Sequence, residues 1–145
     1  MTQRSSHDVI VVGARCAGAA TGMLLARQGL DVVVVDRARS PGDTLSTLGI
    51  SRGGVVQLHR WGLLDAVLDS GAPPVRRVSF HVGGLDQART VKDRAGVDLL
   101  VAPRRYVLDA LLAEAAADAG ADVRYGTTVG DVLRGPDGRV RGVLT

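Results

Sequence analysis

Residues 8–37 read DVIVVGARCAGAATGMLLARQGLDVVVVDR, and this stretch decides the fold. An apolar run over 9–12 leads into Gly13, a segment of small residues follows, and a second apolar run over 32–35 ends at Asp36. Two continuous apolar runs joined by a small-residue helix are typical of parallel strands that are covered on both faces. The pattern predicts a strand, a tight turn, a helix and a second strand, which is the βαβ unit that holds a dinucleotide.

Each part of this unit has a physical task in nucleotide binding. Gly13 permits the sharp turn out of the first strand, and Gly18 allows the helix to sit close to the sheet. The backbone N–H groups at the start of the helix, with the positive end of its dipole, are expected to face a pyrophosphate. Asp36 is expected to accept hydrogen bonds from a ribose 2′-hydroxyl, as in FAD or NAD.

The glycine pattern departs from the G-x-G-x-x-G consensus because Arg15 stands where the middle glycine is expected. An arginine fits there only if its backbone keeps a negative φ and its side chain swings aside or onto the phosphates. The alternative is a helix packed on a strand without a ligand, in which Gly18 and Gly22 merely allow close contact. The flanking strands and the acid at the end of the second strand favour the nucleotide.

The composition excludes several classes of protein. Apolar residues make up 46% of the 145-residue chain and charged residues 23%, as in a globular domain. Aromatic residues are only 3%, and the 18 basic residues are scattered among 15 acidic ones, so no nucleic-acid partner is expected. The single cysteine, Cys16, excludes an internal disulfide and the dithiol of a flavin disulfide reductase.

No metal site, membrane span or secretion signal is expected. The three histidines have no partners at metal-ligand spacing, and no apolar run approaches the roughly 20 residues of a membrane span. The first apolar run is also too short for a signal peptide, so we expect a cytoplasmic protein.

The rest of the chain completes an α/β fold class: a three-layer Rossmann-like domain with a parallel sheet in the order 3-2-1 and a C-terminal β-hairpin. The elements expected after the second strand are a loop over 37–51, two short helices within 55–68 separated at Gly62, strands over 78–82 and 97–102 with a polar connection over 83–92, a helix over 104–119, a strand over 122–125, and a hairpin from 129–133 and 140–144.

Several segments, in this order, resemble a known family. They are GARCAGAATGMLLARQG at 13–29, the pair at 36–37, DTLST at 43–47, GVVQLHRWGLLD at 54–65, and APRRYVLDALLAEAAADAGADVRYGTTVGDV at 102–132. The chain resembles the FAD-dependent monooxygenases of the p-hydroxybenzoate hydroxylase type and their geranylgeranyl-reductase-like relatives. The resemblance implies a partial FAD-binding domain over 1–145, with an excursion toward the substrate domain over 75–102.

The resemblance also implies roles for individual residues. Gly13, Ala14, Arg15 and Gly18 would form the pyrophosphate turn, Asp36 and Arg37 would hold the adenosine ribose, Ser46 and Thr47 would lie near the flavin ring, Arg105 would contact FAD from the start of a helix, and Val129 would present its backbone to the adenine.

Simpler roles stay open for some of these residues. Arg105 could be solvated at the helix start, although the helix dipole disfavours a cation there and so favours a bound anion. Val129 could be core, and Ser46 and Thr47 could be turn residues.

The implied activity is flavin-dependent oxidation or reduction of a small organic substrate, with NAD(P)H as electron donor. Family members continue past the last residue, so we expect a fragment, a truncated gene product or a split module that binds FAD weakly and has no turnover. The strand over 9–12 would then be an open sheet edge that favours self-association. The alternatives are an NAD-binding dehydrogenase module and a non-catalytic remnant.

Overall fold

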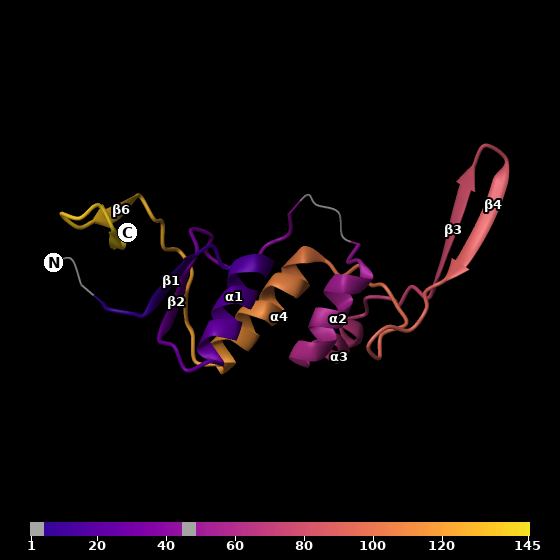
Figure 1. Cartoon of the computed structure of the whole chain (residues 1–145), viewed down its shortest axis with the longest axis horizontal. Coiled ribbons are helices and arrows are strands. Elements are labelled where there is room, and N and C mark those ends of the chain that lie inside the picture. The colour runs from indigo at the N-terminus through magenta and orange to yellow at the C-terminus, as the bar shows by residue number, and fades with distance from the viewer. Residues whose placement is uncertain (1–4, 45–48) are drawn as a thin grey trace. The chain divides into compact units, whose positions relative to one another are not determined.

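The computed structural model describes residues 5–44 and 49–145. The chain forms two compact units, the first made of Met1–Gly42 and Asp109–Thr145 and the second of Asp43–Leu108. Figure 1 shows the course of the chain through the helices and strands of both units.

A parallel sheet forms the centre of the first unit. It consists of β1 (Val9–Val12), β2 (Val32–Val35) and β5 (Asp122–Arg124), in the order β1-β2-β5. Val9 pairs with Val32 in the register between β1 and β2, and all four valines of β2 are buried. The predicted α/β class, the parallel pairing of the two valine-rich runs and the strand order are therefore confirmed.

Helix α1 (Cys16–Ala26) crosses from β1 to β2 and packs on both strands. Its buried residues are small except for Met23, so the helix approaches the sheet closely. A Cβ atom on Gly22 would lie only 2.5 Å from Cγ2 of Val34 in β2. The small residues of this segment are thus needed for the close packing of α1 on the strands of the βαβ unit.

Helix α4 (Arg105–Asp118) begins in the second unit and continues from Asp109 in the first, which a β-hairpin completes. Gly120 ends the helical segment with φ of +101°, and β5 follows. Strands β6 (Asp131–Arg134) and β7 (Val140–Leu144) pair antiparallel, and the N–H of Gly138 donates to the carbonyl of Gly135 in the turn between them. The predicted C-terminal hairpin is confirmed.

The second unit contains two short helices, α2 (Arg52–Trp61) and α3 (Leu64–Asp69). Gly62 separates them in the left-handed conformation, with φ of +77°, as the sequence predicts. Val55 and Val67 are fully buried in the core of this unit.

A second hairpin corrects two predictions. Strand β3 (Arg77–Val82) pairs antiparallel with β4 (Leu85–Thr90), so the predicted polar connection over 83–92 is wrong. Every residue of β4 is exposed, so its sequence lacks the apolar alternation that predicts a strand. The sequence signal for the hairpin is instead the pair of turn glycines at 83–84.

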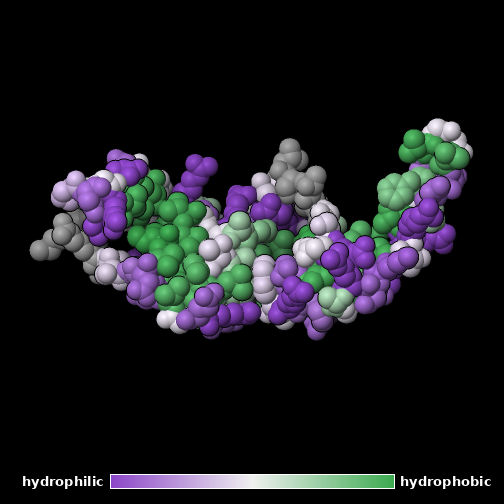
Figure 2. Space-filling model, viewed as in Figure 1, coloured by the Kyte–Doolittle hydropathy of each residue, from purple (hydrophilic) through white to green (hydrophobic). Residues whose placement is uncertain are grey.

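The expectation that the strand over 78–82 is half-buried is also wrong, because Phe80 is 56% and Val82 is 71% exposed. Figure 2 shows the resulting apolar surface toward the end of this hairpin.

The segment over 97–102 does not form the predicted strand. Its apolar residues Val97, Leu99 and Val101 are buried, but only isolated antiparallel bridges hold the segment, including Val75 to Leu100 and Ile50 to Val101. The apolar periodicity of this segment therefore reflects burial of its side chains and not continuous pairing with another strand. None of the helices in the described residues has the length and apolar character needed to span a membrane.

We expect Gly22→Ala to destabilise the protein by roughly 1–3 kcal/mol, because the new methyl group would overlap Val34 and force the helix away from β2. Gly53→Ala in α2 is the matched control, since its added Cβ meets nothing within 4 Å. That control should stabilise its helix by about 0.5–1 kcal/mol. Urea denaturation measures both, and equal stability of the two variants would contradict the close packing of α1.

Candidate functional site

The turn between β1 and α1 is tied to the end of β2. Gly13 adopts φ of +106°, and its N–H donates to the carbonyl of Val35 at 2.7 Å. Arg15 takes the N-cap position of α1 with φ of −84°, and its side chain is exposed. The condition set by the missing middle glycine is therefore met, because a negative φ is available to arginine without strain.

Gly18 is required by the geometry of this turn. A Cβ atom at this position would lie 1.7 Å from the carbonyl oxygen of Gly13 and 3.3 Å from Cγ1 of Val11. No side chain can be placed there without moving backbone atoms. The first turn of α1 is consequently held directly against the end of β1, with its amides at the edge where parallel strands terminate.

The Asp36 carboxylate bridges the ends of the first two strands. Its Oδ2 accepts the N–H of Ala14 at 2.7 Å, and its Oδ1 accepts the N–H of Ala38 at 2.8 Å. Ala14 is only 1% exposed, so its hydrogen bond to Asp36 holds the turn from the buried side. Each carboxylate oxygen keeps capacity for a second donor, such as a ribose hydroxyl.

A second carboxylate, that of Asp109, lies at the start of α1. It is 2% exposed, and its Oδ1 accepts both the Cys16 N–H at 3.0 Å and the Cys16 thiol at 2.9 Å. Asp109 therefore caps the helix from a distant part of the chain and orients the thiol. The sequence analysis included Asp109 only within the quoted stretch over 102–132 and assigned it no role, because an acid 93 residues away has no local capping signature.

The next amides of α1 remain available to a ligand. The N–H of Ala19 donates to the carbonyl of Arg15, which begins the helical ladder. The preceding amides of Ala17 and Gly18 belong to the first turn and have no intrahelical acceptor. Because these donors combine with the positive end of the helix dipole, the turn is suited to an anion such as a diphosphate.

Tyr125 adds a polar group that sequence reasoning missed. It follows β5, and its buried hydroxyl makes no hydrogen bond within the described residues. Burial raises the pKa of this phenol above its ordinary value of 10.0, and the charges of Asp36 and Asp109 raise it further. The hydroxyl is thus a buried donor without an acceptor, in the field of the two carboxylates that border the turn.

The remaining predicted residues belong to other segments of the chain. Arg37 is exposed directly after Asp36, and Val129 is half-buried between β5 and β6. Arg105 begins α4 in the second unit. Arg104, the residue before Arg105, forms an ion pair with Asp43. Ser46 and Thr47 lie outside the described residues.

The groups at the turn after β1 differ from those of a metal site. Within residues 5–44 and 49–145, no three histidine, cysteine or acidic side chains come together as metal ligands. The turn instead combines first-turn amides, a glycine without room for a side chain, a strand-end carboxylate and a buried phenol without a partner.

Comparison with known families gives a match over almost the entire chain. A family model described as "FAD binding domain" matches residues 6–144. The chain is 34% identical over 149 residues to a menaquinone reductase of Mycolicibacterium smegmatis, covering 94% of this chain and 33% of that protein. It is 36% identical over 123 residues to a rifampicin monooxygenase of Rhodococcus hoagii, covering 84% of this chain and 25% of that protein.

A third relative is digeranylgeranylglycerophospholipid reductase 2 of Methanothermobacter thermautotrophicus. It is 32% identical over 150 residues, and the match covers 91% of this chain and 36% of that protein. The chain therefore spans about a quarter to a third of the length of these relatives.

Solved structures share the fold at lower sequence identity. The myxobacterial chondrochloren halogenase superposes with a TM-score of 0.80 at 22% identity, over 94% of this chain and 32% of that one. A geranylgeranyl bacteriochlorophyll reductase-like protein of Thermoplasma acidophilum superposes with a TM-score of 0.74 at 24% identity, over 94% of this chain and 34% of that one.

We expect Tyr125 to ionise only above pH 10, because burial and two nearby carboxylates disfavour the phenolate. A raised pKa in the folded state contributes stability below the ordinary phenol pKa, and that stability is lost as the pH rises through the folded-state value. Ultraviolet titration of a Tyr106→Phe variant isolates Tyr125, because the chain has two tyrosines. Asp36→Asn should lower the measured pKa, and an unchanged value would show that Asp36 does not act on this phenol.

Proposed function

The chain belongs to the FAD binding domain family, and from this premise we propose that it holds the adenosine diphosphate half of FAD at the turn after β1. The bound flavin would serve an oxidoreductase, of the monooxygenase or reductase type, that acts on a small organic substrate. The observation that carries the proposal is the approach of α1 to β1 at Gly18, which leaves free amides at the end of the parallel sheet.

The pyrophosphate would lie against the first turn of α1. The amides of Ala17 and Gly18 would donate to its oxygens, and the exposed side chain of Arg15 would add a positive charge. Gly13 gives the turn a backbone path that a larger residue would follow only with strain, since its φ is +106°. These features support binding of a diphosphate without any base-specific contact.

The ribose would be bound by Asp36. Its two backbone hydrogen bonds hold the carboxylate in place, so the ribose 2′-hydroxyl would meet an acceptor that is already oriented. The same negative charge would repel the 2′-phosphate of NADP, which favours FAD over that cofactor at this site. We further assign Arg37 to the neighbourhood of the ribose, Val129 to the adenine, and Arg105, Ser46 and Thr47 to the remainder of the flavin nucleotide.

Flavin supplies the redox chemistry in such proteins, while the polypeptide supplies binding, orientation and electrostatics. Two relatives named as reductases and one named as a monooxygenase support a flavin-dependent oxidation or reduction in the complete protein. NAD(P)H is the electron donor that we propose for it. The exposed apolar residues of the β3–β4 hairpin are consistent with residues 75–102 forming an excursion toward a substrate domain.

An NAD-binding dehydrogenase module fits the chain order less well. In such a module a helix and a third strand would follow β2 directly. Here the whole second unit, Asp43–Leu108, stands between β2 and β5. This insertion separates the two parts of the parallel sheet along the chain and favours the flavin assignment.

Asp36→Ala should weaken FAD binding by roughly 1–3 kcal/mol, the usual loss for a hydrogen bond to a charged group. Flavin fluorescence during titration gives the affinity. Asp118→Ala is the control, since Asp118 is exposed and lies at the other end of α4 from Asp109. A 2′-deoxy analogue of FAD distinguishes loss of the hydrogen bond to the ribose from loosening of the turn. The analogue should bind more weakly than FAD to the unaltered chain. Asp36→Ala should bind the analogue and FAD equally well.

Two outcomes would overturn the assignment. The first is an unchanged FAD affinity in Asp36→Ala, which would show that the acid does not face the ribose. The second is tighter binding of NAD than of FAD by the unaltered chain, which would restore the dehydrogenase alternative.

We also propose that this chain self-associates along β1. Within the described residues β1 pairs only with β2, so its other edge carries unpaired backbone groups, and Val12 on this strand is 60% exposed. Val12→Lys should shift the chain toward the monomer in sedimentation measured over a range of concentrations. Leu24→Lys, which adds the same charge on the surface of α1, is the control and should leave association as it is. Equal effects of the two substitutions would contradict pairing along β1.

A further inference from the structure

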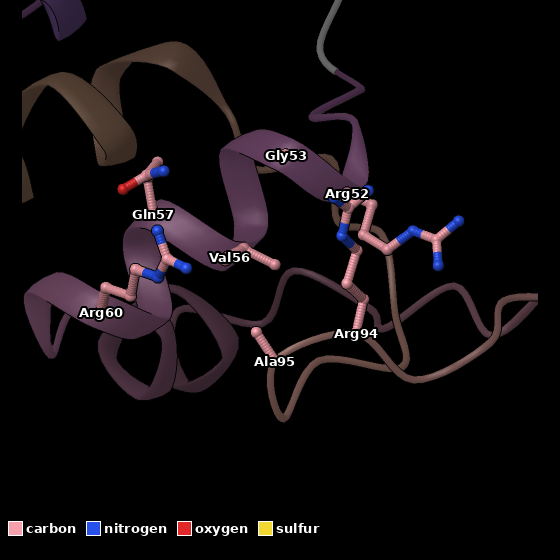
Figure 3. Close-up of a pocket in the computed structure, with 7 residues that line it drawn as sticks. All are labelled: Arg52, Gly53, Val56, Gln57, Arg60, Arg94 and Ala95. Carbon is pink, nitrogen blue, oxygen red and sulfur yellow. The ribbon is translucent and has the colours of Figure 1, made fainter.

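A cavity of about 240 Å³ lies in the second unit, and none of the residues assigned above to FAD lines it. One side of it is a face of α2 that carries Arg52, Val56 and Arg60, and the other side is a loop at Arg94 and Ala95. Figure 3 shows Arg94 rising from this loop toward the first turn of α2. Three arginines from two separate segments thus line one small space.

The positive charges of these arginines are not neutralised by the protein. Arg52 donates to the backbone carbonyl of Lys92 at 2.9 Å, which is a neutral acceptor. No carboxylate of the described residues forms an ion pair with Arg52, Arg60 or Arg94, and no acidic side chain lines the cavity. By contrast, Arg76 and Arg104 in the same unit pair with Asp98 and Asp43. The cavity therefore concentrates unpaired cationic side chains.

The direction of α2 adds to the positive potential. The cavity lies along the first turn of this helix, which has no acidic residue in that turn and no side-chain N-cap bond. Arg52 at this end opposes the helix dipole, an arrangement that a bound anion would relieve. Gly53 lines the cavity, and even a Cβ there would meet nothing within 4 Å, so the backbone amides can be approached closely.

The loop that closes the cavity is a tight turn under backbone strain. Arg94 and Val97 exchange backbone hydrogen bonds of 3.0 and 3.2 Å, and the residues between them have φ of +55° at Ala95 and +80° at Gly96. A turn with two positive φ values favours glycine or asparagine, so an alanine there is strained. The strain is local to the turn that carries Arg94 into the cavity.

We propose that this cavity is a binding site for a small phosphate-bearing anion, held by Arg60 and Arg94 with the first turn of α2. Guanidinium groups match the geometry of phosphate oxygens with paired N–H donors, and a helix N-terminus adds backbone donors. The volume selects the ligand, since 240 Å³ is below the roughly 300–1,000 Å³ of pockets for drug-sized molecules. A phosphate or diphosphate group fits this volume.

The test is calorimetric titration of inorganic pyrophosphate into the chain and into single-arginine variants. Arg60→Ala and Arg94→Ala should each weaken binding by about tenfold or more, as expected for loss of a charge-assisted hydrogen bond. Arg77→Ala is the matched control, because Arg77 is an exposed arginine of the same unit that does not line the cavity. It should leave the affinity unchanged.

A further variant separates this site from the FAD site. If pyrophosphate instead occupied the turn after β1, Arg15→Ala would weaken binding while Arg60→Ala and Arg94→Ala would not, and the proposal would be overturned. Absence of pyrophosphate binding, or equal losses in all arginine variants including Arg77→Ala, would also overturn it.

The source of the phosphate is distinguished by repeating the titration with ADP in the Arg15→Ala background. Tighter binding of ADP than of pyrophosphate that depends on Arg94 would identify a nucleotide phosphate, and the reverse order would identify a free anion. FAD affinity measured in parallel reports separately on the site at Gly18, so failure of one assignment leaves the other testable.

Discussion

The contact of Gly18 with the carbonyl of Gly13 is the constraint on which the rest of the first unit depends. With no room for a Cβ atom, the first turn of α1 lies directly on the end of β1. Gly22 repeats the close approach one turn later against Val34 in β2. Gly18 against β1 and Gly22 against β2 therefore fix the position of α1 on the sheet. The N-terminal amides of this helix lie at the edge of the sheet.

Two carboxylates from distant parts of the chain hold the ends of this arrangement. Asp36 accepts the amide of Ala14 and so ties the turn to the end of β2. Asp109 accepts the amide and thiol of Cys16 and so ties the start of α1 to α4. Both acids lie near the proposed diphosphate, which would raise the electrostatic cost of an anion there. In the proposed complex the first-turn amides, the helix dipole and Arg15 would offset this cost.

The second unit distributes its charge differently. Two of its acids pair with arginines that do not line the cavity, Asp98 with Arg76 and Asp43 with Arg104. Among the residues that the structure describes, no carboxylate pairs with the arginines of the cavity. The two proposed anion sites thus differ in origin, because one would use backbone amides and the other guanidinium groups. Because side-chain cations can rotate away and helix amides cannot, the turn after β1 is the more preorganised of the two.

The sequence by itself determined the βαβ unit, the strand order, the split of the helices at Gly62 and the C-terminal hairpin. These follow from local causes: continuous apolar runs, glycine at a positive φ and turn residues at the right spacing. It could not reveal β4, whose residues are all exposed and which exists only through pairing with β3. It also predicted a strand over 97–102, because buried side chains on a segment held only by isolated bridges give the same apolar pattern as a strand.

The tertiary structure alone decided which polar groups meet at the site. Asp109 caps a helix 93 residues away, and Tyr125 is brought into the field of Asp36 and Asp109 only when β5 joins the sheet. Arg94 reaches α2 through a strained turn that no local propensity favours. Each of these encounters joins residues far apart in the chain, and local patterns carry no record of such contacts.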